Sequence, residues 1–253
     1  MVNIYRALEG LKETSKVYMD DQYARILEST IINVVKEKGK KAYVIVDKSI
    51  FHPRSGGQPN DIGVIEKEGT MFRVLKVLNV RGVLAHYGKF IEGNFNAGNK
   101  VKLKIDWNHR FRVMKLHTAG HIIDYALKKI YGKVINTLDA FHGPPKAYIV
   151  YDAEAPSPEM LHKIEKEANK IVKENRKVKV IYATQESLLK IAFNAPNLDR
   201  LPPSEKYRVV VIEGVNGIPC TGTHVKETSE VGEIKIIGME KLERGFKLFY
   251  NVL

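Results

Sequence analysis

The sequence has little of what would place the protein outside a reducing compartment or in a membrane. It contains one cysteine, Cys220, among 253 residues, which excludes an internal disulfide framework. No apolar run approaches the roughly 20 residues that a membrane-spanning helix needs, and no signal-peptide-like apolar stretch lies near the N-terminus. We therefore expect a cytoplasmic protein without a membrane partner.

Acidic residues are also scarce relative to basic ones. The chain has 29 Asp and Glu residues against 41 Lys and Arg residues, which gives a formal net charge of +12. This imbalance favours a polyanionic partner, of which nucleic acid is the commonest, although a lysine-rich surface that only keeps the protein in solution would look the same. The hydrophobic content of 44% is typical of a globular protein with one large domain or two modest ones.

The first part of the chain has the pattern of short β-strands. Residues 27–36 and 42–51 are apolar and β-branched, and a turn containing Lys and Gly separates them, which predicts a hairpin. Further glycine-punctuated strands up to Val83 indicate a small barrel or a curled sheet. The Gly- and Asn-rich residues 92–99 are the best candidate boundary, so we predict domains at 1–97 and 98–253.

The second part alternates helices and strands. Apolar residues at helical spacing predict a helix from a cap at Asn108 to Gly132, and another runs from Pro158 to Lys173. The remaining periodic segments predict strands at 101–105, 147–151, 178–182, 207–213, 232–237 and 246–252. Helices between mostly antiparallel strands make the expected fold class α+β.

Two short segments carry good metal ligands. They read His117-Thr118-Ala119-Gly120-His121 and Cys220-Thr221-Gly222-Thr223-His224. On a helix, residues at i and i+4 lie on one face with Cβ atoms about 5–6 Å apart, which is close enough to share one ion. Imidazole nitrogen and thiolate sulfur suit Zn²⁺, so we expect one zinc ion at His117, His121, Cys220 and His224. Buried structural histidines and an inert thiol are the alternative.

Three further groups of residues are candidates for binding. The loop at residues 52–61 combines paired glycines, which permit close backbone approach, with polar side chains, although it can also be a simple turn. Basic residues surround the start of the first helix, where free N–H groups already attract phosphate, although a solvated basic turn would look the same. Hydroxyl groups beside the ligands can orient water or substrate, or they can simply pack or cap. The loop candidates are Ser55, Gly56, Gly57, Gln58 and Asp61; the phosphate-contact candidates are Arg54, Arg110, Arg112 and Lys115; the substrate candidates are Thr118, Thr137, Thr221 and Thr223.

Three motifs in this order resemble one family. They are FHPRSGGQPNDIG from Phe51, RVMKLHTAGHII from Arg112, and CTGTHVKETSEVGEIKI from Cys220. Together they are similar to the alanyl-tRNA editing proteins (the AlaX group) and to the editing domain of alanyl-tRNA synthetase. Two departures are Thr221 and His52, where the family usually has glycine and tyrosine.

The resemblance implies a fold, a metal and an activity. The fold is a small N-terminal β-barrel followed by an α/β editing domain of the threonyl/alanyl-tRNA synthetase type. The metal is one zinc held by His117, His121, Cys220 and His224. Because a catalytic zinc usually keeps three protein ligands and an open position, we expect His224 to bind loosely or to stand beside the ligands, unless the zinc only anchors the substrate. The activity is trans-acting hydrolysis of mischarged tRNA(Ala), chiefly Ser-tRNA(Ala) with Gly-tRNA(Ala) as a second candidate, while Ala-tRNA(Ala) is spared.

Other functions remain open at this point. A zinc-stabilised nucleic-acid-binding module without catalysis would explain the charge and the ligands, but not the polar loop at 52–61. A metal-dependent hydrolase of small esters or amides would not need the positive charge. A threonyl-type editing hydrolase is a closer alternative.

Overall fold

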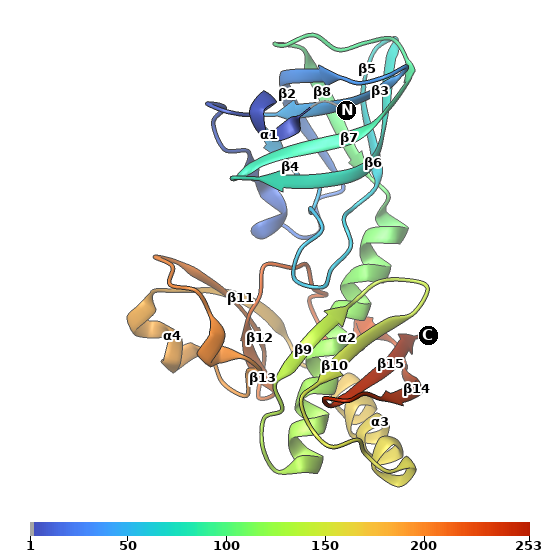
Figure 1. The fold of residues 1–253 in the computed structure, drawn as a ribbon, viewed down its shortest axis with the longest axis vertical. Helices are drawn as coiled ribbons and strands as arrows, with labels where there is room; N and C mark the ends of the chain where they lie inside the picture. Colours follow the sequence, from blue (N-terminus) through green and yellow to red (C-terminus); the bar gives the residue numbers. More distant parts are fainter. Residues whose placement is uncertain (1–2) are drawn as a thin grey trace. The chain divides into compact units, whose positions relative to one another are not determined.

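The computed structural model describes residues 3–253, which form two compact units. The barrel unit consists of the chain up to Ser55 together with Pro59–Phe111. The α+β unit consists of Gly56–Gln58 and Arg112–Leu253, so three residues of the 52–61 loop belong to the second unit. Figure 1 shows the strands and helices of both units.

Six strands of the barrel unit close into an antiparallel barrel, in the order β2-β3-β7-β6-β5-β8. Alternate residues point inward, as in β6, where Phe72 and Val74 are buried and Arg73 between them is exposed. The barrel predicted from the sequence is confirmed. The barrel strands are β2 (Ile26–Lys36), β3 (Lys41–Val46), β5 (Gly63–Lys67), β6 (Thr70–Val80), β7 (Val83–Glu92) and β8 (Lys100–Ile105).

Short elements complete the barrel unit. The second strand of the predicted hairpin ends at Val46, earlier than expected, because the chain then pairs in parallel with a segment near the N-terminus. The short elements are α1 (Ile4–Ala7), β1 (Ser15–Lys16), η1 (Val17–Met19) and β4 (Lys48–Ser49).

The unit boundary lies later in the chain than residue 97. Strand β8 pairs with both β2 and β5, so the barrel is not closed without residues 100–105. The division falls between Phe111 and Arg112, inside helix α2 (Trp107–Tyr131). Composition pointed to the Gly- and Asn-rich loop, whereas strand pairing carries the barrel beyond it.

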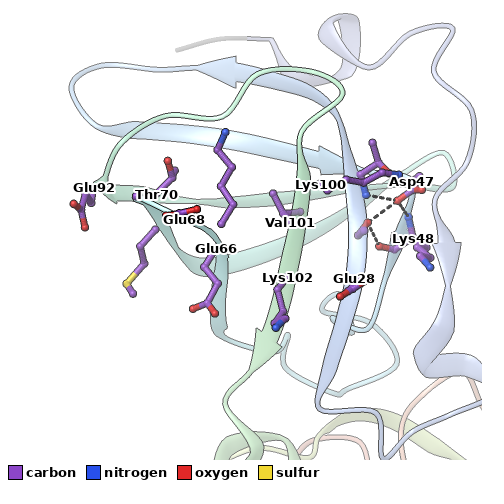
Figure 2. A pocket seen from close by; sticks show the side chains of 15 residues that line it. Glu28, Asp47, Lys48, Glu66, Glu68, Thr70, Glu92, Lys100, Val101 and Lys102 are labelled. Atoms are coloured by element: carbon purple, nitrogen blue, oxygen red, sulfur yellow. Dashed lines mark hydrogen bonds between the residues drawn. The ribbon is translucent and has the colours of Figure 1, made fainter.

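A hollow of about 820 Å³ lies on the barrel unit. Figure 2 shows acidic and basic side chains interleaved around it, with Asp47 hydrogen-bonded to its neighbours. The Asp47 carboxylate accepts hydrogen bonds from Ser29 Oγ at 2.6 Å and from the backbone N–H of Thr30 at 2.8 Å. Because both signs of charge line this hollow, it does not form a concentrated phosphate-binding surface.

The α+β unit contains two antiparallel sheets, with strand orders β14-β15-β10-β9 and β11-β12-β13. Asn169 and Glu165 of helix α3 accept hydrogen bonds from backbone N–H groups of β14, which holds this helix beside the first sheet. The strands are β9 (Thr137–Phe141), β10 (Ala147–Tyr151), β11 (Val178–Ala183), β12 (Tyr207–Ile212), β13 (Asn216–Pro219), β14 (Ile234–Lys241) and β15 (Phe246–Val252). The helical segments are α2, α3 (Pro158–Lys173), α4 (Gln185–Ile191), η2 (Leu198–Arg200) and η3 (Thr228–Val231).

Local sequence signals account for the ends of the long helices. Helix α3 begins at the expected proline, and the Ser157 side chain caps it by accepting from Met160 N–H. Helix α2 begins one residue before the expected cap, because Asp106 rather than Asn108 accepts from the N–H of His109, at 3.0 Å. Within residues 3–253, no helix combines the length and apolar character needed to cross a bilayer.

Candidate metal centre

Helix α2 presents the first two donors of the centre. His117 and His121 lie one turn apart on its buried face, with exposed fractions of 2% and 5%. The loop after β13 brings the other two, Cys220 and His224, to the same place. One donor atom from each of the four side chains lies within 4.8 Å of the others, and this group can hold a metal ion.

Backbone contacts shape the loop that carries Cys220 and His224. Arg208 on β12 donates through one guanidinium nitrogen to the carbonyl oxygens of Cys220 and Gly222, at 2.7 and 2.9 Å. Gly222 passes so close to helix α2 that an added Cβ would lie 2.2 Å from His117 Cε1. Glycine at position 222 is therefore a steric requirement of the centre.

Gln58 orients the ring of His117. Its Oε1 atom lies 2.9 Å from His117 Nδ1 and accepts from the N–H of Thr223 at 2.8 Å. Because the Thr223 N–H can only donate, the amide end that it contacts must be the oxygen, and the Nε2 atom donates to Thr223 Oγ1 at 2.9 Å. His117 Nδ1 must therefore carry the hydrogen, and the lone pair on its Nε2 atom can bind a metal.

Thr118 orients the ring of His224. The Thr118 hydroxyl donates to the carbonyl of Met114 at 2.9 Å, so its contact with His224 Nδ1 at 3.1 Å is one in which it accepts. His224 is fully buried and presents its Nε2 atom towards Cys220 Sγ. This geometry gives no support to the looser binding expected of His224.

The donor set fits zinc in chemistry and in spacing. With Zn–N of about 2.0–2.1 Å and Zn–S of about 2.3 Å, a tetrahedral site places sulfur and nitrogen about 3.6 Å apart. Cys220 Sγ lies 3.6 Å from His117 Nε2 and 3.4 Å from His224 Nε2. Among residues 3–253, the buried His121 Nδ1 atom has no hydrogen-bond partner.

Burial favours the neutral form of two of the donors, His121 and Cys220. Burial lowers the pKa of His121 to about 3, and the charges of His142 and Arg208 act in the same direction. Burial also raises the pKa of the Cys220 thiol, although the Gly222 N–H and Arg208 oppose this shift. Imidazoles with low pKa values are ready to bind a cation, and the thiol must release a proton when it does so.

A cavity of about 560 Å³ lies beside the centre. His117, His121 and Cys220 form part of its wall, together with Thr137 and Thr221. The other two threonine candidates, Thr118 and Thr223, are fully buried and hydrogen-bond to His224 and Gln58. The structure thus divides the four threonines into two that line the cavity and two that hold the ligands or their partners.

His142 belongs to the site but has no signal in the sequence. Its ring stacks on His117 with centroids 4.4 Å apart, and it lines the cavity. Burial lowers its pKa to about 4. Tyr250 donates to the Leu116 carbonyl at 3.0 Å, so His142 Nδ1 must donate to the Tyr250 hydroxyl at 2.6 Å. A neutral His142 therefore has its lone pair on Nε2.

Asp124 is a second cavity residue that the sequence did not reveal. It lies one turn after His121 and accepts from the Tyr151 hydroxyl at 2.7 Å. Burial raises its pKa to about 7. A lone Asp or His outside a repeated spacing gives no pattern from which such a position can be inferred.

Several expected site residues lie elsewhere. Arg110 is fully buried in the barrel unit, where it forms an ion pair with Asp61 and donates to the Ile50 carbonyl. Arg110 is therefore not accessible to phosphate. Asp61 pairs with Arg110 and does not line the cavity. Arg112 is half-buried and donates to Asn251 Oδ1 at 2.6 Å.

The remaining candidates are at least partly accessible. Arg54 and Gly56 are exposed, and Ser55 and Lys115 are half-buried. Gly56 and Gly57 line the cavity, and the Gly57 carbonyl accepts from His142 N–H at 2.8 Å. The paired glycines therefore place the main chain against the site, whereas Ser55 belongs to the barrel unit.

Two family models match the chain. Residues 2–109 match the model described as tRNA synthetases class II (A). Residues 207–246, which include Cys220 and His224, match the threonyl and alanyl tRNA synthetase second additional domain.

Individual relatives cover most of the chain. It is 34% identical over 229 residues to the alanyl-tRNA editing protein AlaX-L of Pyrococcus horikoshii, an alignment that covers 89% of this chain and 54% of that protein. It is 32% identical over 238 residues to the alanine–tRNA ligase of Ignicoccus hospitalis, covering 94% of this chain and 26% of the ligase. The chain thus spans about half the length of the editing protein and about a quarter of the ligase.

Proposed function

Because the chain belongs to the sequence family that includes alanyl-tRNA editing proteins and alanine–tRNA ligases, we propose that it hydrolyses aminoacyl esters of tRNA. Its substrate is mischarged tRNA(Ala), chiefly Ser-tRNA(Ala) with Gly-tRNA(Ala) second, and Ala-tRNA(Ala) is spared. The observation that carries this proposal is the group of four side chains that can hold a metal ion, three of which form part of the wall of the cavity.

We propose zinc as the metal, held by His117, His121, Cys220 and His224. When bound, zinc supplies positive charge that stabilises the oxyanion of ester hydrolysis and lowers the pKa of water. Gln58 and Thr118 hydrogen-bond to the Nδ1 atoms of two of the imidazoles, and Arg208 holds the ligand loop. A closed site with four protein ligands is typical of structural zinc, whereas a catalytic zinc keeps an open position. For catalysis, therefore, either one ligand would leave the metal or the metal would only anchor the substrate.

The proposed selectivity depends on the serine hydroxyl, since alanine differs from serine by that group alone. A pocket that hydrogen-bonds a hydroxyl discriminates against the analogue lacking it, because a buried polar group is then left unpaired. Thr137 and Thr221 line the cavity and are the candidates for this contact.

The net charge of +12 supports tRNA as the partner, and we propose that the reaction takes place in the cytoplasm. Lys and Arg contacts to phosphate make binding weaken steeply with salt. Arg54 is exposed and remains a candidate contact, and Lys206 lies at the cavity. Arg110 is left out of this set because its charge is buried against Asp61.

The experiment is to follow deacylation of Ser-tRNA(Ala), Gly-tRNA(Ala) and Ala-tRNA(Ala) by the native protein and by the Cys220→Ala variant. We expect rapid loss of serine, slower loss of glycine, little loss of alanine, and no activity in the variant. Ser-tRNA(Thr) is the control that separates a threonyl-type editor. If the protein binds zinc and tRNA but cleaves none of these esters, the non-catalytic nucleic-acid-binding alternative replaces the proposal.

A further inference from the structure

The side-chain amide of Asn197 donates hydrogen bonds to one cavity residue, Thr137. Its Nδ2 atom donates to the carbonyl oxygen of Thr137 at 2.9 Å and to Thr137 Oγ1 at 2.8 Å. A backbone carbonyl only accepts hydrogen bonds, so the nitrogen end of the amide must be the end that faces Thr137. Both hydrogens of the amide are therefore used on this single residue.

This contact determines what the Thr137 hydroxyl can offer. Its oxygen accepts from Asn197, and its own hydrogen has no acceptor among residues 3–253. Thr137 lines the cavity beside the metal centre. The hydroxyl is thereby left as a hydrogen-bond donor for a group that enters the cavity.

The backbone on both sides of this pair is specialised. Asn197 has φ of 56° and ψ of 24°, the left-handed region that asparagine tolerates better than most residues, and its N–H donates to Asn136 Oδ1 at 2.8 Å. On β9, the register shifts so that Tyr151 pairs with Thr137 while Val150 pairs with Asp139. A bulge of this kind changes the direction of the side chains next to it, here at Thr137.

The other end of the amide shows that the arrangement has a cost. Asn197 Oδ1 is buried and has no hydrogen-bond partner in the described part of the chain. A buried unpaired carbonyl lowers stability, and native structures contain few of them. Packing alone does not explain an amide held with its oxygen unpaired, whereas a requirement to present two donors to Thr137 does.

We propose that Asn197 is a positioning residue for substrate selection, which fixes Thr137 as a donor to the side-chain oxygen of the substrate amino acid. This inference rests on the proposed function and refines it. A serine side chain supplies the acceptor that the Thr137 hydroxyl lacks, and an alanine side chain does not. Asn197 also lines the cavity, and its role in this inference is to hold Thr137.

The test compares two asparagines that both have a positive φ angle. Asn197→Gly keeps a residue suited to positive φ and removes the amide. Asn194→Gly is the matched control, because Asn194 also has positive φ, at 50°, but its amide donates to the Val215 carbonyl at 2.7 Å. The measured quantity is the ratio of kcat/KM for Ser-tRNA(Ala) to that for Ala-tRNA(Ala), with thermal unfolding as the check on folding.

We expect Asn197→Gly to lower this ratio about 10-fold, the scale of one directed hydrogen bond, and Asn194→Gly to leave it unchanged. Asn197→Asp, whose carboxylate accepts the Thr137 hydrogen instead of donating, should lower it at least as far. Adding Asn197→Gly to Thr137→Val should cause no further loss, because both changes remove the same donor.

An unchanged ratio in Asn197→Gly overturns the inference, and so does an additive loss in the double variant. In either case the native protein still removes serine, so the proposed function stands. If the native protein removes serine no faster than the Cys220→Ala variant does, the proposed function fails and the inference falls with it.

Discussion

Replacing Gln58 by alanine should weaken metal binding without touching a ligand. Gln58 is fully buried and makes hydrogen bonds to His117 Nδ1 and to both the N–H and the hydroxyl of Thr223, at 2.8–2.9 Å. Alanine removes all of these contacts and leaves the His117 ring free to turn or to change tautomer. The ligand loop loses its tie to residue 58 at the same time.

The size of the effect follows from these contacts. Removing a hydrogen-bond partner of a ligating histidine typically costs 10–100-fold in metal affinity, which is about 1.4–2.8 kcal/mol. Two buried donors, His117 Nδ1–H and the Thr223 N–H, also lose their acceptor, at about 1–3 kcal/mol each in folding stability. We therefore expect a zinc Kd raised 10- to 100-fold and a free energy of unfolding lowered by about 2 kcal/mol or more.

Competition against a chromophoric chelator measures the zinc affinity, and urea unfolding of the metal-free protein measures the stability. Gln58→Glu keeps an oxygen acceptor at the same position and should retain most of the affinity. Asn60→Ala is the control, because Asn60 lies in the same loop but its amide donates to the carbonyls of Asp61 and Leu75. Zinc affinity in Gln58→Ala equal to that of the native protein would refute the conclusion that Gln58 orients His117.

Two predictions concern the barrel unit. Asp61→Asn leaves Arg110 as a buried cation without its carboxylate partner. We therefore expect the free energy of unfolding to fall by about 3–5 kcal/mol, and a loss of less than about 1 kcal/mol in urea unfolding would contradict this prediction. Burial lowers the pKa of His86 to about 4 from 6.5, so between these values the unfolded chain binds a proton that the folded protein does not. The contribution of neutral His86 to the free energy of unfolding is complete above pH 6.5 and is lost as the pH falls to 4, by about 3 kcal/mol in total. His86→Gln should remove this part of the acid sensitivity, which urea unfolding at each pH measures.

Much of the fold was predictable because its signals are local. Helix α3 and strands β10 and β15 have the bounds expected from apolar spacing, and the expected barrel and α+β class are confirmed. The prediction of elements and boundaries was less accurate where pairing between strands decides the structure. Strand β9 and helix α4 were not expected, and β8 carries the barrel unit past the boundary placed at residue 97.

The family resemblance drawn from three motifs is confirmed by the matches to the alanyl-tRNA editing protein and the ligases. The four candidate metal ligands could be identified because they form two short spacings, and the structure brings their donor atoms within 4.8 Å of one another. That these residues bind zinc, that they take part in catalysis, and which residues contact the substrate all stay predictions. The phosphate contact expected of Arg110 was wrong, since a basic residue at a helix start can be solvated or buried and the sequence around it does not say which.

The sequence by itself determined the elements with a regular period and the identity of the four donor side chains. Only the tertiary structure decided which groups hold them. Gln58 reaches His117 across 59 positions of the chain, and Asn197 reaches Thr137 across 60. Spacing in the sequence encodes neighbours on one helix or strand, because those repeats are set by backbone geometry. Hydrogen bonds between distant segments have no such period, and their partners are set only when the sheets and the ligand loop have packed.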